Sequence, residues 1–280
     1  MYEFSGKLKV TALVLMVIGA LGIGFGFFDG AGKTIDDAKD VIEHHEAEKA
    51  RKAEEALLNP QYGRQNSKVD RVQEAEANTD SHEAHVATDD SHHVKHVLNQ
   101  LHNRPWAALY TALFFSFMIA LTIFAFYAMQ IAASAGWSVV LFRVMEAFSA
   151  NLLTMGILLF VFLVASAMGM NHIFPWMHAD GDAIIEGKSW WLNIPGWLIR
   201  SAVYIGMFIF FRYIIRKKSL QQDHADDYTA HKKGFKYTIL FLAFFMLAES
   251  ALSWDWIMSL DPHWFSSLFG WYIFAFYRII

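Results

Sequence analysis

Long apolar stretches are the feature that most constrains how this chain of 280 residues can fold. A helix needs about 20 mainly apolar residues to cross the hydrocarbon of a bilayer. The sequence therefore predicts an all-α, polytopic integral membrane protein. Its transmembrane helices should form bundles, with at least six spans. We expect these spans at residues 8–28, 106–132, 139–170, 191–215, 235–253 and 264–280.

Composition supports a membrane protein. Hydrophobic residues make up 55% of the chain and aromatic residues 16%, while charged residues make up only 18%. These values fit a membrane protein better than a soluble domain of this length. The last apolar stretch, 264–280, has only seventeen residues and ends without a polar cap. We therefore expect the sequence to be the N-terminal part of a longer protein.

Residues 29–105 have a different character from the rest of the chain. They hold sixteen acids, ten lysines or arginines and eight of the 13 histidines. We expect a helix over 33–58, which is rich in Ala, Glu and Lys, and a polar loop over 59–103. The predicted organisation is a first span within 1–28, a polar insertion over 29–105, and the remaining spans over 106–280.

Histidines within this insertion have a spacing that suits a metal ion. However, the insertion has no cysteine and no core of its own to hold ligands in place. A solvated insertion without a metal is therefore the favoured interpretation. The histidines concerned are His82, His85, His92, His93 and His96.

Basic residues in the short loops predict the orientation. Lysine and arginine collect on the cytoplasmic side of membrane proteins. The loop between the fourth and fifth spans is rich in both, whereas the loop after the third span has only Lys188. We therefore expect a multi-pass protein of the bacterial inner membrane with a cytoplasmic N-terminus. The polar insertion and residues 249–263 would then face the periplasm.

Several classes of cofactor and partner are disfavoured. The chain contains no cysteine, so it holds neither a thiolate-bound iron–sulfur cluster nor a disulfide. No histidine lies in the middle of a predicted span, which argues against haem. A net charge of −4 without a basic stripe argues against nucleic acid. If the protein handles electrons, partner subunits must carry the redox centres.

The stretch 249–272 is the strongest candidate site. A carboxylate at membrane depth costs about 2.5–3.5 kcal/mol, so such groups are usually functional or paired. Glu249, Asp255 and His263 lie here beside Trp254 and Trp256. Acids and a histidine in an aromatic setting suit a lipid-soluble substrate that exchanges protons, such as a quinol. A hydrogen bond between helices would also explain Glu249, and an interfacial aromatic belt would explain the tryptophans.

Other polar residues near the ends of spans have simpler explanations. Asp261 precedes Pro262 and suits the N-cap of the next helix. Arg212 suits a side chain that reaches to the membrane surface, while Arg200 lies deeper without an obvious partner. His172 and His178, in the loop after the third span, could reach the same periplasmic pocket.

Arg143 and Glu146 are the candidates on the cytoplasmic side. They are three residues apart and share one helical face within an apolar run. An ion pair is the simplest account of this spacing. A second possibility is that the pair belongs to a path for proton uptake.

Two sequence blocks resemble a known family. MYEFSGKLKV before a glycine-rich span, and SWDWIMSLDPHWFSSLFGWY near the end, are similar to the ActF family. This is one of two polysulfide-reductase-type (NrfD-like) membrane subunits of alternative complex III, a quinol:cytochrome c oxidoreductase. The resemblance covers essentially the whole chain, and the block 255–265 is its most specific part. Family members have about ten helices, so this chain would be roughly the first half.

The resemblance implies a subunit of a respiratory complex that oxidises menaquinol. The electrons would pass through an iron–sulfur subunit and c-type cytochrome subunits, which carry the haem, toward a terminal oxidase. It also implies four-helix bundles and a periplasmic quinol pocket, which here would use Glu249, Asp255 and His263. Arg143 and Glu146 would be candidates for proton conduction. The family also contains a sister subunit that packs beside the iron–sulfur subunit and is the better-supported quinol oxidiser.

Three functions therefore remain open. The first is a quinol-site or proton-path subunit without redox cofactors of its own. The second is a structural scaffold that has lost quinol chemistry and whose polar residues join helices. The third is a proton-coupled transporter, which ranks last because the six segments show neither an internal repeat nor a Gly/Pro break at the midplane.

Overall fold

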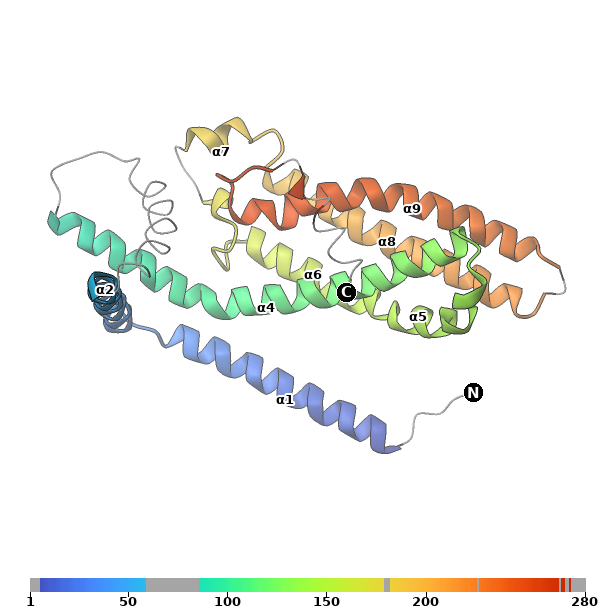
Figure 1. Ribbon diagram of the computed structural model, residues 1–280, viewed down its shortest axis with the longest axis horizontal. Helices are drawn as coiled ribbons and strands as arrows, with labels where there is room; N and C mark the ends of the chain where they lie inside the picture. Colours follow the sequence, from blue (N-terminus) through green and yellow to red (C-terminus); the bar gives the residue numbers. More distant parts are fainter. Residues whose placement is uncertain are drawn as a thin grey trace. The chain divides into compact units, whose positions relative to one another are not determined.

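The computed structural model describes residues 6–58, 86–178, 182–225, 227–266, 268, 269 and 272. All its regular elements in these ranges are helical (Figure 1). The chain divides into two compact units, Met1–Pro105 and Trp106–Ile280. His82 and His85 lie outside the described residues, as do the side chains of His92, His93 and His96.

The first unit contains α1 (Gly6–Ala31), α2 (Ile35–Leu58) and the beginning of α4 (Val86–Ala132). The helix predicted over 33–58 is confirmed as α2. The loop predicted over 59–103 is wrong for residues 86–103, which form the polar first turns of α4. Polar composition predicted exposure to water, but it does not prevent a helix, and the candidate span that begins at Val97 belongs to the same helix.

Local contacts fix the junction between α1 and α2 in the first unit. The Thr34 backbone N–H donates to Oδ2 of Asp37 at 2.7 Å, which caps the start of α2. A Cβ atom on Gly30 would lie 2.8 Å from the ring of Pro105, so only glycine fits at that point. Nε2 of His102 lies 3.2 Å from the Lys33 carbonyl oxygen.

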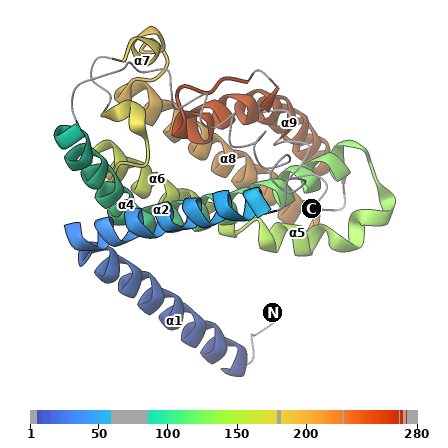
Figure 2. The same ribbon diagram turned by 60° about the vertical axis from the view of Figure 1, so that its left-hand side comes forward.

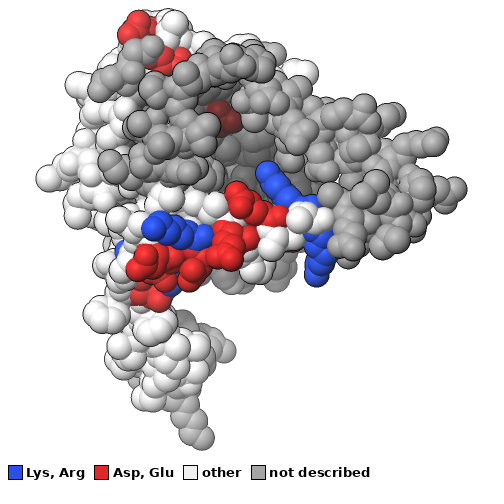
Figure 3. Space-filling view, turned by 90° about the vertical axis from the view of Figure 1, so that its left-hand side faces the viewer, with Lys and Arg blue, Asp and Glu red and all other residues white. Residues whose placement is uncertain are grey.

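Acidic side chains dominate the surface of α2. Figure 3 shows them in red along the band that this helix makes across the face in view. The acids include Asp36, Asp40, Glu43 and Glu46, all of them exposed. This composition indicates a helix that remains in water.

The second unit is a bundle of four long helices. They are α4 from Trp106 onward, α6 (Asn151–Ala167), α8 (Ile194–Gln222) and α9 (Thr229–Trp256). Figures 1 and 2 show them side by side, with α8 and α9 joined by a short loop. Asn193 caps α8, because its side-chain oxygen accepts from the Gly196 N–H at 2.7 Å.

The third predicted span is helical but not continuous. It begins with η1 (Gly136–Leu141) and α5 (Phe142–Phe148), and a short turn separates these from α6. The loop that follows α6 contains η2 (Pro175–Met177) and α7 (Ala183–Gly187). After α9 comes the short η3 (Met258–Leu260).

Five helical segments of the described chain are long and apolar enough to cross a membrane, so this is a membrane-embedded multi-pass protein. They confirm the first five predicted spans. The sixth, predicted over 264–280, lies mostly outside the described residues. The five are Leu13–Ala31, Val97–Ala132, Gly136–Ala167, Ile194–Gln222 and Thr229–Leu260.

The core of the bundle is strongly aromatic. Phe124 and Phe208 both contact Phe241 of α9, with ring centroids 4.4 and 6.4 Å apart. These ring contacts link α4, α8 and α9 near the middle of the bundle.

We call the end of the bundle that carries Lys218 and Lys232 the basic end, and the end that carries Arg200 and Asp255 the aromatic end. About 27 Å separates Arg200 from Lys218 along α8 at 1.5 Å per residue.

Candidate functional site

An arginine–aspartate pair lies at the centre of the aromatic end. Nε of Arg200 donates to one carboxylate oxygen of Asp255, and Nη2 donates to the other, both at 2.8 Å. The Asp255 side chain is completely buried, while that of Arg200 is 21% exposed. Arg200 had no predicted partner, and the structure supplies one from the next helix. A bidentate pair of this kind fixes orientation as well as charge.

Further hydrogen bonds hold this pair in place. Tyr204 donates its hydroxyl to Oδ2 of Asp255 at 3.1 Å. The Trp197 indole donates to the Asp255 carbonyl oxygen at 2.7 Å. Trp256 is fully buried beside them, and its indole donates to the Ser201 hydroxyl at 2.9 Å. Asp255 and Trp256 are therefore part of the joint between α8 and α9.

Tryptophans flank the pair. Trp191 lies under the Arg200 guanidinium at 4.2 Å and meets Trp254 edge to face at 5.8 Å. Trp254 is 40% exposed, which suits an aromatic side chain at the membrane interface. Within the described residues, the buried indole nitrogens of Trp176 and Trp191 find no acceptor. Buried N–H groups are rarely left in this way, so both are unsatisfied donors within the described residues.

Glu249 is a buried carboxyl group at the aromatic end. It lies on α9, six residues before Asp255, and only 4% of it is exposed. The described part of the chain offers it neither a hydrogen bond nor a basic partner. A lone buried carboxylate is costly. Six residues rotate a helix by about 240°, so Glu249 and Asp255 occupy different faces of α9.

The remaining predicted residues of this end lie in loops. Nε2 of His263 is 2.9 Å from Oδ2 of Asp182, and its ring is mostly exposed. Asp261 does not cap a helix at this point, because residues 262–266 form a turn and an irregular segment. Its Oδ1 instead accepts from the His263 N–H at 3.2 Å. Proline and aspartate favour a turn as readily as a helix start.

Two histidines stack in the loop that follows α6. The rings of His172 and His178 have centroids 4.3 Å apart and are inclined by 29°. Partial burial and the neighbouring His178 lower the pKa of His172 below its ordinary value. The structure thus brings these two histidines together, and it places His263 beside Asp182.

The basic end also has a buried carboxylate. Glu146 is 2% exposed and accepts from Arg143 at 2.7 Å and from the Tyr127 hydroxyl at 2.8 Å. Arg216 of α8 lies 3.7 Å from the same carboxylate, and Arg143 also pairs with Asp223. The ion pair predicted between Arg143 and Glu146 is confirmed. It belongs to a network that joins α4, α5 and α8.

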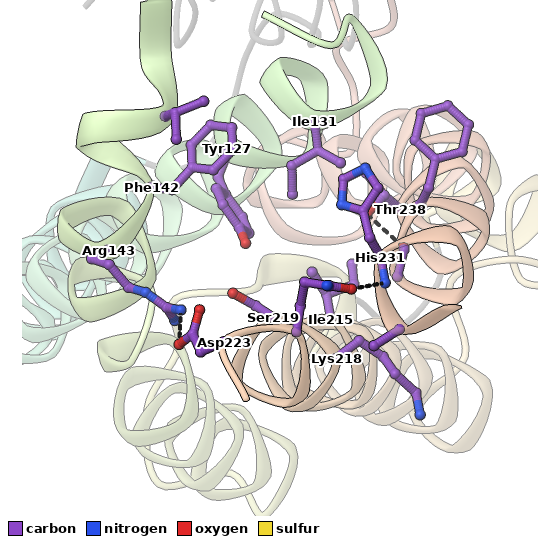
Figure 4. A pocket seen from close by; sticks show the side chains of 15 residues that line it. Tyr127, Ile131, Phe142, Arg143, Ile215, Lys218, Ser219, Asp223, His231 and Thr238 are labelled. Atoms are coloured by element: carbon purple, nitrogen blue, oxygen red, sulfur yellow. Dashed lines mark hydrogen bonds and ion pairs between the residues drawn. The ribbon is translucent and has the colours of Figure 1, made fainter. Parts of the chain in front are cut away.

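A cavity of about 380 Å³ adjoins this network (Figure 4). Arg143 and Asp223 form one side of it, and the Tyr127 and Ser219 side chains lie between that pair and His231. Its remaining lining is mostly apolar, with Ile131 and other residues of α4, η1, α8 and α9. A chain of polar groups therefore leads from the cavity, through Tyr127, to the buried Glu146.

Sequence reasoning noted Arg200 but did not find its partner, and it did not single out Tyr204 or Tyr127. A signal was present for Arg200. It is the first charge in α8, and the predicted orientation placed it at the same end as Asp255. A buried charge requires an opposite charge nearby, so the pair could have been inferred. The tyrosines gave no signal, because tyrosine is common in apolar helices.

Comparison of the chain with protein-family models and with curated proteins gave no match.

Proposed function

We propose that this protein is a membrane subunit of a respiratory quinol:cytochrome c oxidoreductase of the alternative complex III type. In this proposal it contributes proton-exchanging groups, and a quinol pocket at the aromatic end, but no redox centre. Menaquinol is the expected substrate. Partner subunits, including a sister NrfD-like subunit, an iron–sulfur subunit and c-type cytochromes, would accept the electrons. The predicted setting is a bacterial inner membrane with the N-terminus in the cytoplasm.

The observation that carries the proposal is Glu249. It is 4% exposed, lies inside a spanning helix and has no partner among the described residues. Intramembrane carboxyl groups without a structural partner usually take part in proton or substrate handling. The resemblance of the block 255–265 to NrfD-like subunits provides the quinol part of the proposal.

Other residues at the aromatic end would support the same chemistry. The unpaired indole N–H groups of Trp176 and Trp191 are suited to donate to a quinone oxygen. Asp255 is already bound by Arg200, so its role in the proposal is to hold α8 and α9 in position. At the basic end, Tyr127, Glu146 and Arg143 would form the entry of a path for protons.

The scaffold function remains the second candidate, and a specific observation favours it. Asp255 and Glu146 both have arginine partners on a neighbouring helix. Such pairs join helices without any need for catalysis. The two functions make different predictions for Glu249, which has no such partner.

The first test is the composition of the purified complex. The tagged chain, extracted in mild detergent, should bring down subunits with c-type haem and iron–sulfur clusters, visible in the absorption spectrum and by mass spectrometry. If the chain purifies without any such subunit from cells that contain the complex, the proposal is wrong.

The second test is Glu249→Gln in the assembled complex. Loss of a proton-accepting group should lower menaquinol:cytochrome c turnover by about tenfold or more, with the subunit composition unchanged. Glu186→Gln is the matched control, since Glu186 is an exposed carboxyl group in the loop that follows α6. Normal turnover in Glu249→Gln, or loss of partner subunits, would instead favour the scaffold.

A further inference from the structure

Arg212 is a partly buried arginine that the sites described above do not use. It lies on α8, inside the candidate span Ile194–Gln222. Its Nε donates to the hydroxyl oxygen of Ser149 at 3.3 Å, and it forms no ion pair with an acid of the described chain. A charge inside a span is costly unless an opposite charge lies beside it. Arg212 therefore needs an anion that the described residues do not supply.

The polar network at the basic end has more cations than anions. Among the described residues, Arg143 and Arg216 both contact Glu146, and Arg143 also pairs with Asp223. Arg212 adds a third positive charge to these two carboxylates. It is repelled by Arg216, four residues along the same helical face, and Glu146 attracts it without an ion pair. The network therefore lacks one negative charge.

Ser149 holds the Arg212 guanidinium and leaves one edge of it open. This serine lies at the turn between α5 and α6, and its hydroxyl donates to the Glu146 carbonyl oxygen at 2.9 Å, so its oxygen is free to accept from Nε. The two terminal nitrogens of Arg212, Nη1 and Nη2, have no acceptor among the described residues. They form a planar fork that matches two oxygens of a phosphate.

The setting of Arg212 favours a lipid phosphate over a soluble anion. Phe148 and Tyr213, the sequence neighbours of Ser149 and Arg212, are 61% and 62% exposed on a spanning bundle. A basic site between spanning helices, next to a positive surface, suits an anionic lipid headgroup. A soluble anion would gain nothing from the apolar side chains. The exposed lysines of the same end are Lys217, Lys232, Lys233 and Lys236.

We propose that Arg212, with Ser149 and Arg216 beside it, binds the phosphate of an anionic phospholipid at the junction of α5, α6 and α8. The phosphate lies on the open Nη1–Nη2 edge and supplies the missing negative charge. The acyl chains lie along the exposed apolar side chains of α5 and α8. This proposal goes beyond the proposed function and does not depend on quinol chemistry.

The experiment is a lipid titration of the purified full chain in mild detergent, followed by native mass spectrometry. The probes are phosphatidylglycerol, phosphatidylcholine with the same acyl chains, and inorganic phosphate. Phosphatidylglycerol should bind most tightly, because the choline group already neutralises the phosphate of phosphatidylcholine. Arg212→Gln should weaken the binding of phosphatidylglycerol about fivefold, the effect of one basic side chain at an anionic lipid surface. Lys217→Gln, which removes an exposed lysine of the same helix, is the matched control and should leave it unchanged.

A second variant separates the charge of Arg212 from its planar fork. Arg212→Lys keeps the charge but loses the paired donors. It should bind phosphatidylglycerol more weakly than the unmodified protein and more tightly than Arg212→Gln. Gel filtration would verify that both variants remain folded, and Arg212→Lys tests the proposal if Arg212→Gln does not fold.

Four results would overturn the proposal. Equal binding of phosphatidylglycerol and phosphatidylcholine would leave the missing anion to a carboxylate of a partner helix. Inorganic phosphate that binds as tightly as phosphatidylglycerol would indicate a site for small anions. Unchanged binding of phosphatidylglycerol in either Arg212 variant would exclude the guanidinium. Equal losses in Arg212→Gln and Lys217→Gln would indicate a general surface charge.

Discussion

The Arg200 guanidinium of α8 donates a hydrogen bond to each carboxylate oxygen of Asp255 on α9, although the two residues are 55 positions apart in the sequence. The Asp255 carboxylate is completely buried between the two helices, and the Arg200 side chain is 21% exposed. Charges at this depth are costly unless they are paired. The link therefore fixes which face of α9 packs against α8.

Asp255→Asn should destabilise the protein severely. Removing one partner of a buried pair costs about 3–5 kcal/mol, because the other charge is left uncompensated. Unfolding by denaturant in detergent would measure the loss. Asp261→Asn is the control, since Asp261 is exposed and should change little. If Arg200→Met combined with Asp255→Leu is no more stable than Asp255→Asn, the cost does not come from the unpaired charge.

Gly156→Val should weaken the contact between α6 and α8. A Cβ atom on Gly156 would lie 3.0 Å from Cγ2 of Ile205 and 3.4 Å from Cε2 of Phe117. Overfilling such a site costs about 1–3 kcal/mol. Gly206→Val is the matched control, because no atom lies within 4 Å of its Cβ position. Thermal unfolding of both variants would compare them, and equal midpoints would contradict the tight contact.

Tyr127→Phe should lower the free energy of unfolding, because it removes a hydrogen bond to Glu146. The hydroxyl of Tyr127 donates to this buried carboxylate at 2.8 Å, and hydrogen bonds to charged groups contribute about 1.5–3 kcal/mol. Tyr213→Phe removes the same atom from an exposed side chain and should have no effect. A denaturant titration of the two variants provides the comparison. Equal unfolding free energies would show that the hydroxyl contributes nothing.

The spans could be predicted because the length of an apolar stretch can be read directly along the sequence, without knowledge of the packing between helices. Five of them appear where the sequence placed them, with ends shifted by several residues. The break at Ser149 and Ala150 within the third span was not predicted, since both residues are compatible with a helix. The polar start of α4 was also missed, because composition reports exposure to water and not backbone shape.

The candidate sites were harder to predict because side-chain partners depend on the rotation of each helix. Arg143 and Glu146 were paired correctly, since three residues along one helix fix their relation. Glu249 and Asp255 looked equivalent in the sequence, yet Asp255 is bound by Arg200, whereas Glu249 has no partner in the part of the chain that the structure describes. Nothing in the sequence sets the angle at which α8 presents Arg200 to α9.

The stacked histidines His172 and His178 predict a pH dependence of stability. Partial burial and the proximity of His178 lower the pKa of His172, so the folded state binds a proton there less readily than the unfolded state, whose pKa is about 6.5. The stability due to the neutral His172 should therefore be complete above this pH. It should be lost as the pH falls from there through the lowered pKa of the folded protein.

The measurement is the thermal midpoint from about pH 8 to about pH 5, where histidines titrate. Replacing His178 by glutamine removes one cause of the shift, the neighbouring charge, and leaves the effect of burial. The loss of stability on acidification should then become smaller than in the unmodified protein. His224→Gln, in the loop between α8 and α9, should keep the original pH profile. If His178→Gln keeps it as well, the stacked pair does not set the pH response, because the like charge would then have no measurable effect on His172.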